Sequence, residues 1–158
     1  YDGGNLWFQL PLPLAGSIFG ALLVAAIVTS AVVGARIGRG VRGDSAFSGA
    51  IYGVSWVVGS AAVFVTGIAL SRAGADGALL SLYYPAAYAL VAGLIYLMGA
   101  ALWRSLDQLV LGVIIAVVGA VAPLFGAPTN NLVMAVLGGG AFLVAAIVMR
   151  VSLSRRAR

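Results

Sequence analysis

Five long apolar runs, none with a charged residue in its middle, constrain this chain more than any other feature. They cover about residues 14–35, 47–70, 79–103, 106–124 and 132–149. About 20 apolar residues suffice for an α-helix to cross the hydrocarbon core of a bilayer. The runs are continuous, without the polar/apolar alternation of membrane strands. We therefore expect an all-α fold, a polytopic transmembrane helix bundle of five spans, forming a single membrane domain over residues 1–158.

The composition excludes an ordinary soluble domain. Of the 158 residues, 63% are hydrophobic and 8% are charged, whereas soluble domains are about 45–50% apolar and about 25% charged. A domain of this size has too little interior to hide so much apolar surface from water. Lipid is therefore the expected solvent. Abundant Ala, Gly, Val and Arg without any Lys is typical of a GC-rich bacterial source, so we expect a multi-pass protein of the bacterial inner membrane.

Arginines between the runs predict the orientation of the bundle. The short segment from Ala35 to Ser45 holds three of the nine basic residues, and an arginine at the bilayer centre costs roughly 2.5–3.5 kcal/mol. Short Arg-rich loops stay on the cytoplasmic side. Five spans place eight arginines on one side and only Arg72 on the other. The eight are Arg36, Arg39, Arg42, Arg104, Arg150, Arg155, Arg156 and Arg158. We expect the N-terminus outside and the C-terminus in the cytoplasm.

The net charge of +5 does not indicate nucleic acid, because the arginines sit at the ends of apolar runs. Anionic lipid headgroups are the expected partner of such residues. The predicted headgroup contacts are Arg36, Arg39, Arg42, Arg155 and Arg156.

The chemistry of the chain argues against catalysis. Charged residues inside a span normally mark proton relays or ion paths, and here they are absent. The sequence contains no Cys and no His, so the thiolate and imidazole ligands of most transition-metal sites are missing. Neither His nor Lys is present to activate a serine. We expect no enzyme activity, no metal and no cofactor.

Small residues predict where helices pack closely. Gly16 and Gly20 form a GxxxG pattern, as do Gly49 and Gly53, and such patterns let two helix backbones approach. Gly138, Gly139 and Gly140 stand together in the middle of the last run. Each glycine costs a helix about 0.5–1 kcal/mol relative to Ala, so three indicate close packing, a kink or an unwound segment at a binding site. Close packing is the commonest of these in membranes.

Aromatic residues recur at helical spacing. Tyr52 and Trp56 are four residues apart and share a face, and Tyr88 and Tyr96 lie roughly on one side of the third run. A ligand-lining wall is one interpretation. Packing with interfacial anchoring is the other, and it is favoured.

Turn signals separate the last three runs. Ser105 leaves almost no loop before the fourth run, which predicts a tight antiparallel hairpin. The residues Thr129 to Asn131 offer side chains that suit the N-cap of the last helix.

Two functional hypotheses follow. The first is a non-catalytic integral membrane subunit that packs against a larger membrane complex of transporter or respiratory type. The second is a small homo-oligomeric transporter or channel for a neutral, apolar or lipid-like solute, lined by Tyr52, Trp56, Tyr88 and Tyr96. The first fits the charge-free spans, the small-residue faces and the missing cofactor ligands.

Overall fold

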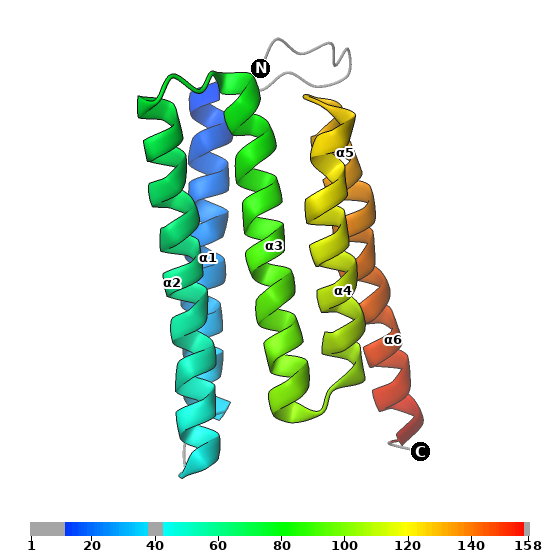
Figure 1. Ribbon diagram of the computed structural model, residues 1–158. Helices are drawn as coiled ribbons and strands as arrows, with labels where there is room; N and C mark the ends of the chain where they lie inside the picture. Colours follow the sequence, from blue (N-terminus) through cyan, green and yellow to red (C-terminus); the bar gives the residue numbers. More distant parts are fainter. Residues whose placement is uncertain (1–11, 38–42, 157–158) are drawn as a thin grey trace. The chain divides into compact units, whose positions relative to one another are not determined.

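The computed structural model describes residues 12–37 and 43–156. These ranges are helical, without a strand, as Figure 1 shows. The elements are α1 (Leu12–Ile37), α2 (Asp44–Arg72), α3 (Gly77–Trp103), α4 (Leu106–Val121), the 3₁₀ turn η1 (Ala122–Phe125), α5 (Thr129–Val133), the π-helical segment η2 (Met134–Gly139) and α6 (Gly140–Arg156). For these residues the predicted all-α class is confirmed.

Among the residues that the structure describes, four helical stretches are long and apolar enough to span a membrane. They cover Asp44–Arg72, Gly77–Trp103, Leu106–Phe125 and Thr129–Val148. Their limits lie within three residues of the limits predicted from the sequence. The chain therefore has the helices of a multi-pass membrane protein.

The chain divides into two compact units, residues 1–46 and residues 47–158. In the first unit, α1 is one 26-residue helix that covers the first predicted run. It begins two residues earlier than that run, with Pro13 in its first turn, where the missing N–H costs no helical hydrogen bond.

In the second unit, α2 and α3 are joined by a short turn. Gly74 takes a left-handed conformation (φ 96°) just after α2. Glycine adopts this conformation without strain, and it commonly ends a helix. Asp76 then caps α3, because its carboxylate accepts a hydrogen bond of 2.7 Å from the backbone N–H of Leu79. Residues 73–76, which include Gly74 and Asp76, complete the reversal of the chain between the two helices.

The hairpin between α3 and α4 is as tight as predicted. Arg104 is left-handed (φ 50°, ψ 42°), and its N–H bonds to the carbonyl of Ala100. Ser105 follows as the N-cap of α4, its hydroxyl accepting from the N–H of Gln108 at 3.3 Å. Figure 1 shows α3 and α4 as an antiparallel pair.

A seam of small residues joins α3 to α4 and forms the best-buried part of the unit. Gly93, Gly112 and Gly119 are buried along it. A Cβ at Gly93 would lie 2.7 Å from the backbone nitrogen of Ala116, and one at Gly112 would lie 2.9 Å from the carbonyl oxygen of Gly93. Without side chains at these positions the two backbones approach directly, as small residues permit in membranes.

Larger apolar side chains complete the core beside this seam. The buried ones are Val63, Ile95, Leu111, Ile115 and Val118. Most other large apolar side chains in the described part are exposed, among them Val57 at 70% and Leu124 at 82%. Such a surface suits lipid rather than water.

The start of α5 differs from the prediction. Pro128 occupies the N-cap and makes no side-chain cap bond, and the helix begins at Thr129. Asn130 therefore lies inside the helix and is completely buried. Its Nδ2 donates to the carbonyl of Ser81 in α3 at 2.9 Å. The predicted capping role was wrong for all three residues, because Pro128 takes the N-cap position, and the side chain of Asn130 ties α5 to α3 instead.

Candidate functional site

A chain of aromatic rings links α2, α3 and α6. Tyr52 lies at 4.7 Å from Trp103 and 6.3 Å from Trp56, measured between ring centroids. Trp56 continues to Tyr96 at 6.0 Å, and Tyr96 to Phe142 at 5.9 Å. All four pairs are edge-to-face, the arrangement that aromatic quadrupoles favour. We call these five residues the aromatic chain.

Tyr88 lies apart from the aromatic chain. It is 39% exposed and stacks on Tyr84 with 6.3 Å between centroids. Tyr84 also contacts Tyr83, whose hydroxyl donates to the carbonyl of Val63 at 3.0 Å. Three of the four predicted lining residues therefore come together, and the fourth belongs to a second aromatic group that fastens α3 to α2.

The end of the aromatic chain nearest the α3–α4 hairpin contains a buried amide. The Oε1 atom of Gln108 is buried and has no hydrogen-bond partner. A Cβ at Gly99 would collide with this oxygen and would lie 2.9 Å from the ring of Tyr52 and 3.1 Å from that of Trp103. Gly99 thus makes room for the amide and both rings, whose edges carry partial positive charge.

The rings of the aromatic chain contact one another across three helices. Neighbouring rings meet edge to face, so each ring has at least one aromatic partner within the aromatic chain. This geometry supports the packing interpretation over a ligand wall. The sequence patterns did not predict Trp103, Gln108 or Phe142 as members of this cluster. Of the three, only Trp103 carried a signal, by its position beside the hairpin.

The three consecutive glycines face three different surroundings. Gly138 is buried, and a Cβ there would lie 3.9 Å from the side chains of Ile115 and Val118 in α4. Gly139 is exposed, and a Cβ there meets no atom within 4 Å. Gly140 also has open space beside it and lines a groove. The helix is π-helical up to Gly139, neither broken nor unwound.

Of the other predicted packing glycines, two adjoin open space and two have surroundings that the structure does not describe. Gly49 and Gly53 are exposed, and a Cβ at either meets no atom within 4 Å. The surroundings of Gly16 and Gly20 are outside the part of α1 whose side-chain environment is described. Helix packing by these four glycines stays a prediction.

Among the glycines whose surroundings are described, six that were not predicted as packing residues do pack closely. A Cβ at each would come within 3 Å of a neighbouring helix; they are Gly59, Gly67, Gly93, Gly99, Gly112 and Gly119. The sequence held a signal for the α3–α4 seam, because small residues recur seven apart on both helices. These pairs are Ala86 with Gly93, and Gly112 with Gly119.

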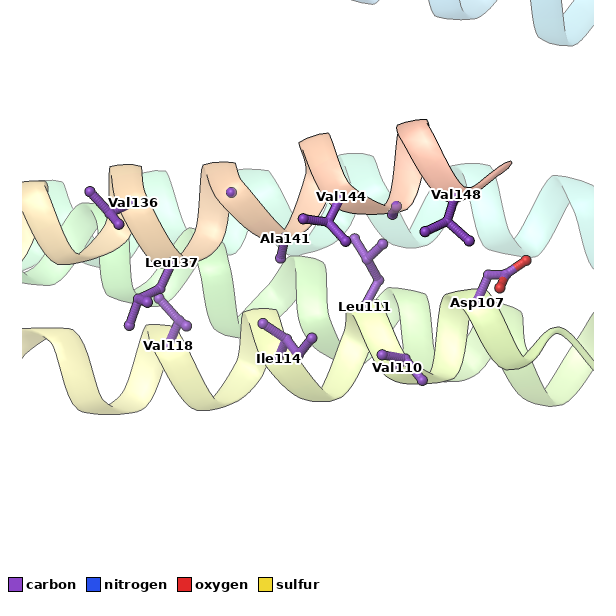
Figure 2. A pocket seen from close by; sticks show the side chains of 12 residues that line it. Asp107, Val110, Leu111, Ile114, Val118, Val136, Leu137, Ala141, Val144 and Val148 are labelled. Atoms are coloured by element: carbon purple, nitrogen blue, oxygen red, sulfur yellow. The ribbon is translucent and has the colours of Figure 1, made fainter. Parts of the chain in front are cut away.

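An apolar groove of about 570 Å³ lies between α4 and the helix formed by η2 and α6. Figure 2 shows Leu111 and Val144 on its facing walls and Asp107 at one end, beside Val148. We call it the α4–α6 groove. Its lining is Asp107, Val110, Leu111, Ile114, Val118, Val136, Leu137, Gly140, Ala141, Val144, Ala145 and Val148. Asp107 is the one charged residue among these twelve.

Two arginines flank the charged end of the α4–α6 groove in the sequence. Arg104 precedes Asp107 by three residues, and Arg150 follows Val148 by two. All three charged side chains are exposed. In the described part of the chain, no ion pair joins Asp107 to either arginine.

The predicted headgroup contacts are described only at Arg36. This arginine is exposed in the last turn of α1, where a positive charge suits the helix dipole. Arg39 and Arg42 lie outside the described residues, as do the side chains of Arg155 and Arg156. Contact with anionic lipid stays a prediction for all five.

No family model, no curated protein and no solved structure matches this chain.

Proposed function

We propose that this chain is a non-catalytic integral membrane subunit that packs against a larger membrane assembly, of transporter or respiratory type. The observation that carries the proposal is a division among its helical glycines. The buried glycines of α3 and α4 contact a neighbouring helix, whereas Gly49, Gly53 and Gly139 have no described atom within 4 Å of a Cβ position; the buried ones are Gly93, Gly99, Gly112 and Gly119. In membranes, close helix packing is the common reason for a glycine inside a helix, so these open positions suit helices of another protein.

The proposal includes a topology of five spans in one membrane domain. Its support is the arginine distribution together with the turns at residues 73–76 and 104–105, which lie at opposite ends of α3. The N-terminus would be outside, and the C-terminus in the cytoplasm of a bacterial cell. Anionic headgroups would neutralise the arginines on the cytoplasmic side.

The topology is testable without background labelling, because the sequence contains no Cys. The experiment introduces single cysteines at Ala75 and at Ser105 and treats intact cells with a membrane-impermeant maleimide. We expect Ala75→Cys to react and Ser105→Cys to react only after lysis. The opposite pattern would refute the orientation.

The assembly is tested by filling the open faces. Gly139→Leu and Gly53→Leu add side chains at positions where a Cβ meets no described atom within 4 Å, so each variant is expected to fold. The control is Ala120→Leu, a matched enlargement at an exposed position of α4. On native gels of gently extracted membranes, we expect the wild-type chain and the control to migrate in a complex and both glycine variants to migrate free of it. An unchanged complex in both glycine variants would overturn the proposal.

A second candidate is a small homo-oligomeric transporter or channel for a neutral, apolar or lipid-like solute. The observation that favours it is the π-helical segment η2, because π-helical turns are frequent at functional sites. Tyr52, Trp56 and Tyr96 would contribute to the lining, without Tyr88. Recovery of the wild-type chain alone from its native membrane, as one defined oligomer, would favour this candidate over the subunit. Solute binding that survives Tyr96→Ala would then exclude the aromatic lining.

A further inference from the structure

We propose that the α4–α6 groove binds one acyl chain of an aminophospholipid, whose ammonium group pairs with Asp107. This inference does not depend on the proposed function, since either a subunit or a transporter can hold a lipid at this place.

The length of the α4–α6 groove fits one leaflet of a bilayer. On α4 its lining runs from Asp107 to Val118, eleven helical steps of about 1.5 Å, or about 17 Å. Half of a hydrocarbon core is about 15 Å thick. The lining on the facing helix, from Val136 to Val148, covers a similar rise. The groove therefore extends from the membrane surface to about the midplane, as one acyl chain does.

The walls of the groove suit a flexible chain of methylene groups. Beyond Asp107, every lining side chain is aliphatic or absent, so no polar group requires a partner inside the groove. The hollow on one wall results from Gly140, Ala141 and Ala145. Burying apolar surface within an apolar groove needs no directional contact.

The charges at the mouth identify the headgroup. Trp103 and Arg104 mark this end as the membrane–water interface, where Trp and basic residues concentrate. Asp107 is exposed there without an ion-pair partner among the described residues. An aminophospholipid brings an ammonium group for Asp107 and a phosphate for Arg104 or Arg150. An anionic glycerol headgroup brings a phosphate but no cation, so the carboxylate would repel it.

The test compares two lipids with identical acyl chains, dipalmitoyl phosphatidylethanolamine and dipalmitoyl phosphatidylglycerol. Native mass spectrometry of the full chain measures the binding of each. We expect the wild-type protein to prefer phosphatidylethanolamine. Asp107→Asn should lower that preference about two- to fivefold, which corresponds to the strength of one partly exposed ion pair. Asp44→Asn, at an exposed carboxylate at the start of α2, should leave the preference unchanged.

A second pair of variants tests the groove itself. Ala145→Phe fills it, whereas Ala146→Phe places the same ring at an exposed residue outside the lining. Only Ala145→Phe should weaken the binding of both lipids. Equal binding of the two lipids by the wild-type protein, or an unchanged preference in Asp107→Asn, would overturn the proposal. A protein helix crosslinked to Ala145 in the native membrane would also overturn it. If Ala145→Phe does not fold, the surface substitution Asp107→Asn still decides the outcome.

Discussion

Replacing Gly93 with alanine should destabilise the protein, although alanine is the better helix former. A Cβ at Gly93 would lie 2.7 Å from the nitrogen, 2.8 Å from the Cβ and 2.9 Å from the Cα of Ala116. Two of these three atoms are backbone and have no rotamer with which to move away. The α3–α4 seam must therefore open for the variant to fold.

The magnitude follows from two opposing terms. Overpacking of this kind costs about 1–3 kcal/mol, whereas alanine gains about 0.5–1 kcal/mol over glycine inside a helix. At Gly53 only the gain applies, because a Cβ there meets no atom within 4 Å. We therefore expect Gly93→Ala to be less stable than Gly53→Ala by about 1–3 kcal/mol, a factor of about five to 150 in the unfolding equilibrium.

The assay is reversible unfolding in mixed detergent micelles, followed by tryptophan fluorescence. A third variant, Gly93→Ala with Ala116→Gly, removes the opposing Cβ and keeps the backbone atoms. We expect it to recover only part of the lost stability. If Gly93→Ala is as stable as Gly53→Ala, the close backbone approach is refuted. Full recovery in the double variant would mean that Gly93 faces a side chain alone.

Two further predictions concern hydrogen bonds that hold helices together. Asn130→Ala should lower the free energy of unfolding by about 1–3 kcal/mol, because it removes the buried hydrogen bond from Nδ2 to the carbonyl of Ser81 and leaves a cavity. An unfolding midpoint equal to that of the wild type in the same assay would contradict a structural role for that amide. Tyr83→Phe removes the bond to Val63 between α3 and α2 and should cost about 0.5–1.5 kcal/mol. Its control is Tyr88→Phe, at an exposed ring whose hydroxyl makes no bond in the described part; equal losses in the two variants would argue against the Val63 bond.

The limits of the helices could be predicted from the sequence because the bilayer sets them. A span ends where apolar residues give way to arginine, proline or a glycine turn, as at Arg72 and Trp103. The hairpin at Ser105 was equally predictable, since no residues were left between the two apolar runs to form a longer loop.

Which face of each helix packs was much harder to predict. A helix that is apolar all round carries no pattern that separates lipid from protein. Gly49 and Gly53 form a GxxxG pair beside open space, yet Gly93 and Gly112 lie directly against the backbone of a neighbouring helix. The seven-residue spacings of Ala86 with Gly93 and of Gly112 with Gly119 were visible in the sequence. Small-residue patterns of this kind are frequent, however, in a chain with 22 glycines.

Asn130 illustrates a different difficulty. Asparagine near a helix start predicts a cap, and a shift of the first helical residue decides whether the prediction holds. Here Pro128 takes the capping position, so Asn130 enters the helix and turns toward Ser81. Only the neighbouring carbonyl, supplied by a residue distant in sequence, determines that outcome.

The π-helical segment η2 sets the rotational phase of everything that follows it. A π turn takes about one residue more than an α turn, and one residue corresponds to about 100° around an α-helix. The side chains of α6 are therefore rotated by about that angle relative to an uninterrupted helix from Thr129. Asn130, which precedes η2, points to α3; with this offset, Phe142 meets Tyr96 and Val144 faces Leu111 across the α4–α6 groove. A single-residue deletion within η2 would turn Phe142 and Val144 away together, so both contacts depend on the length of this segment as well as on their own side chains.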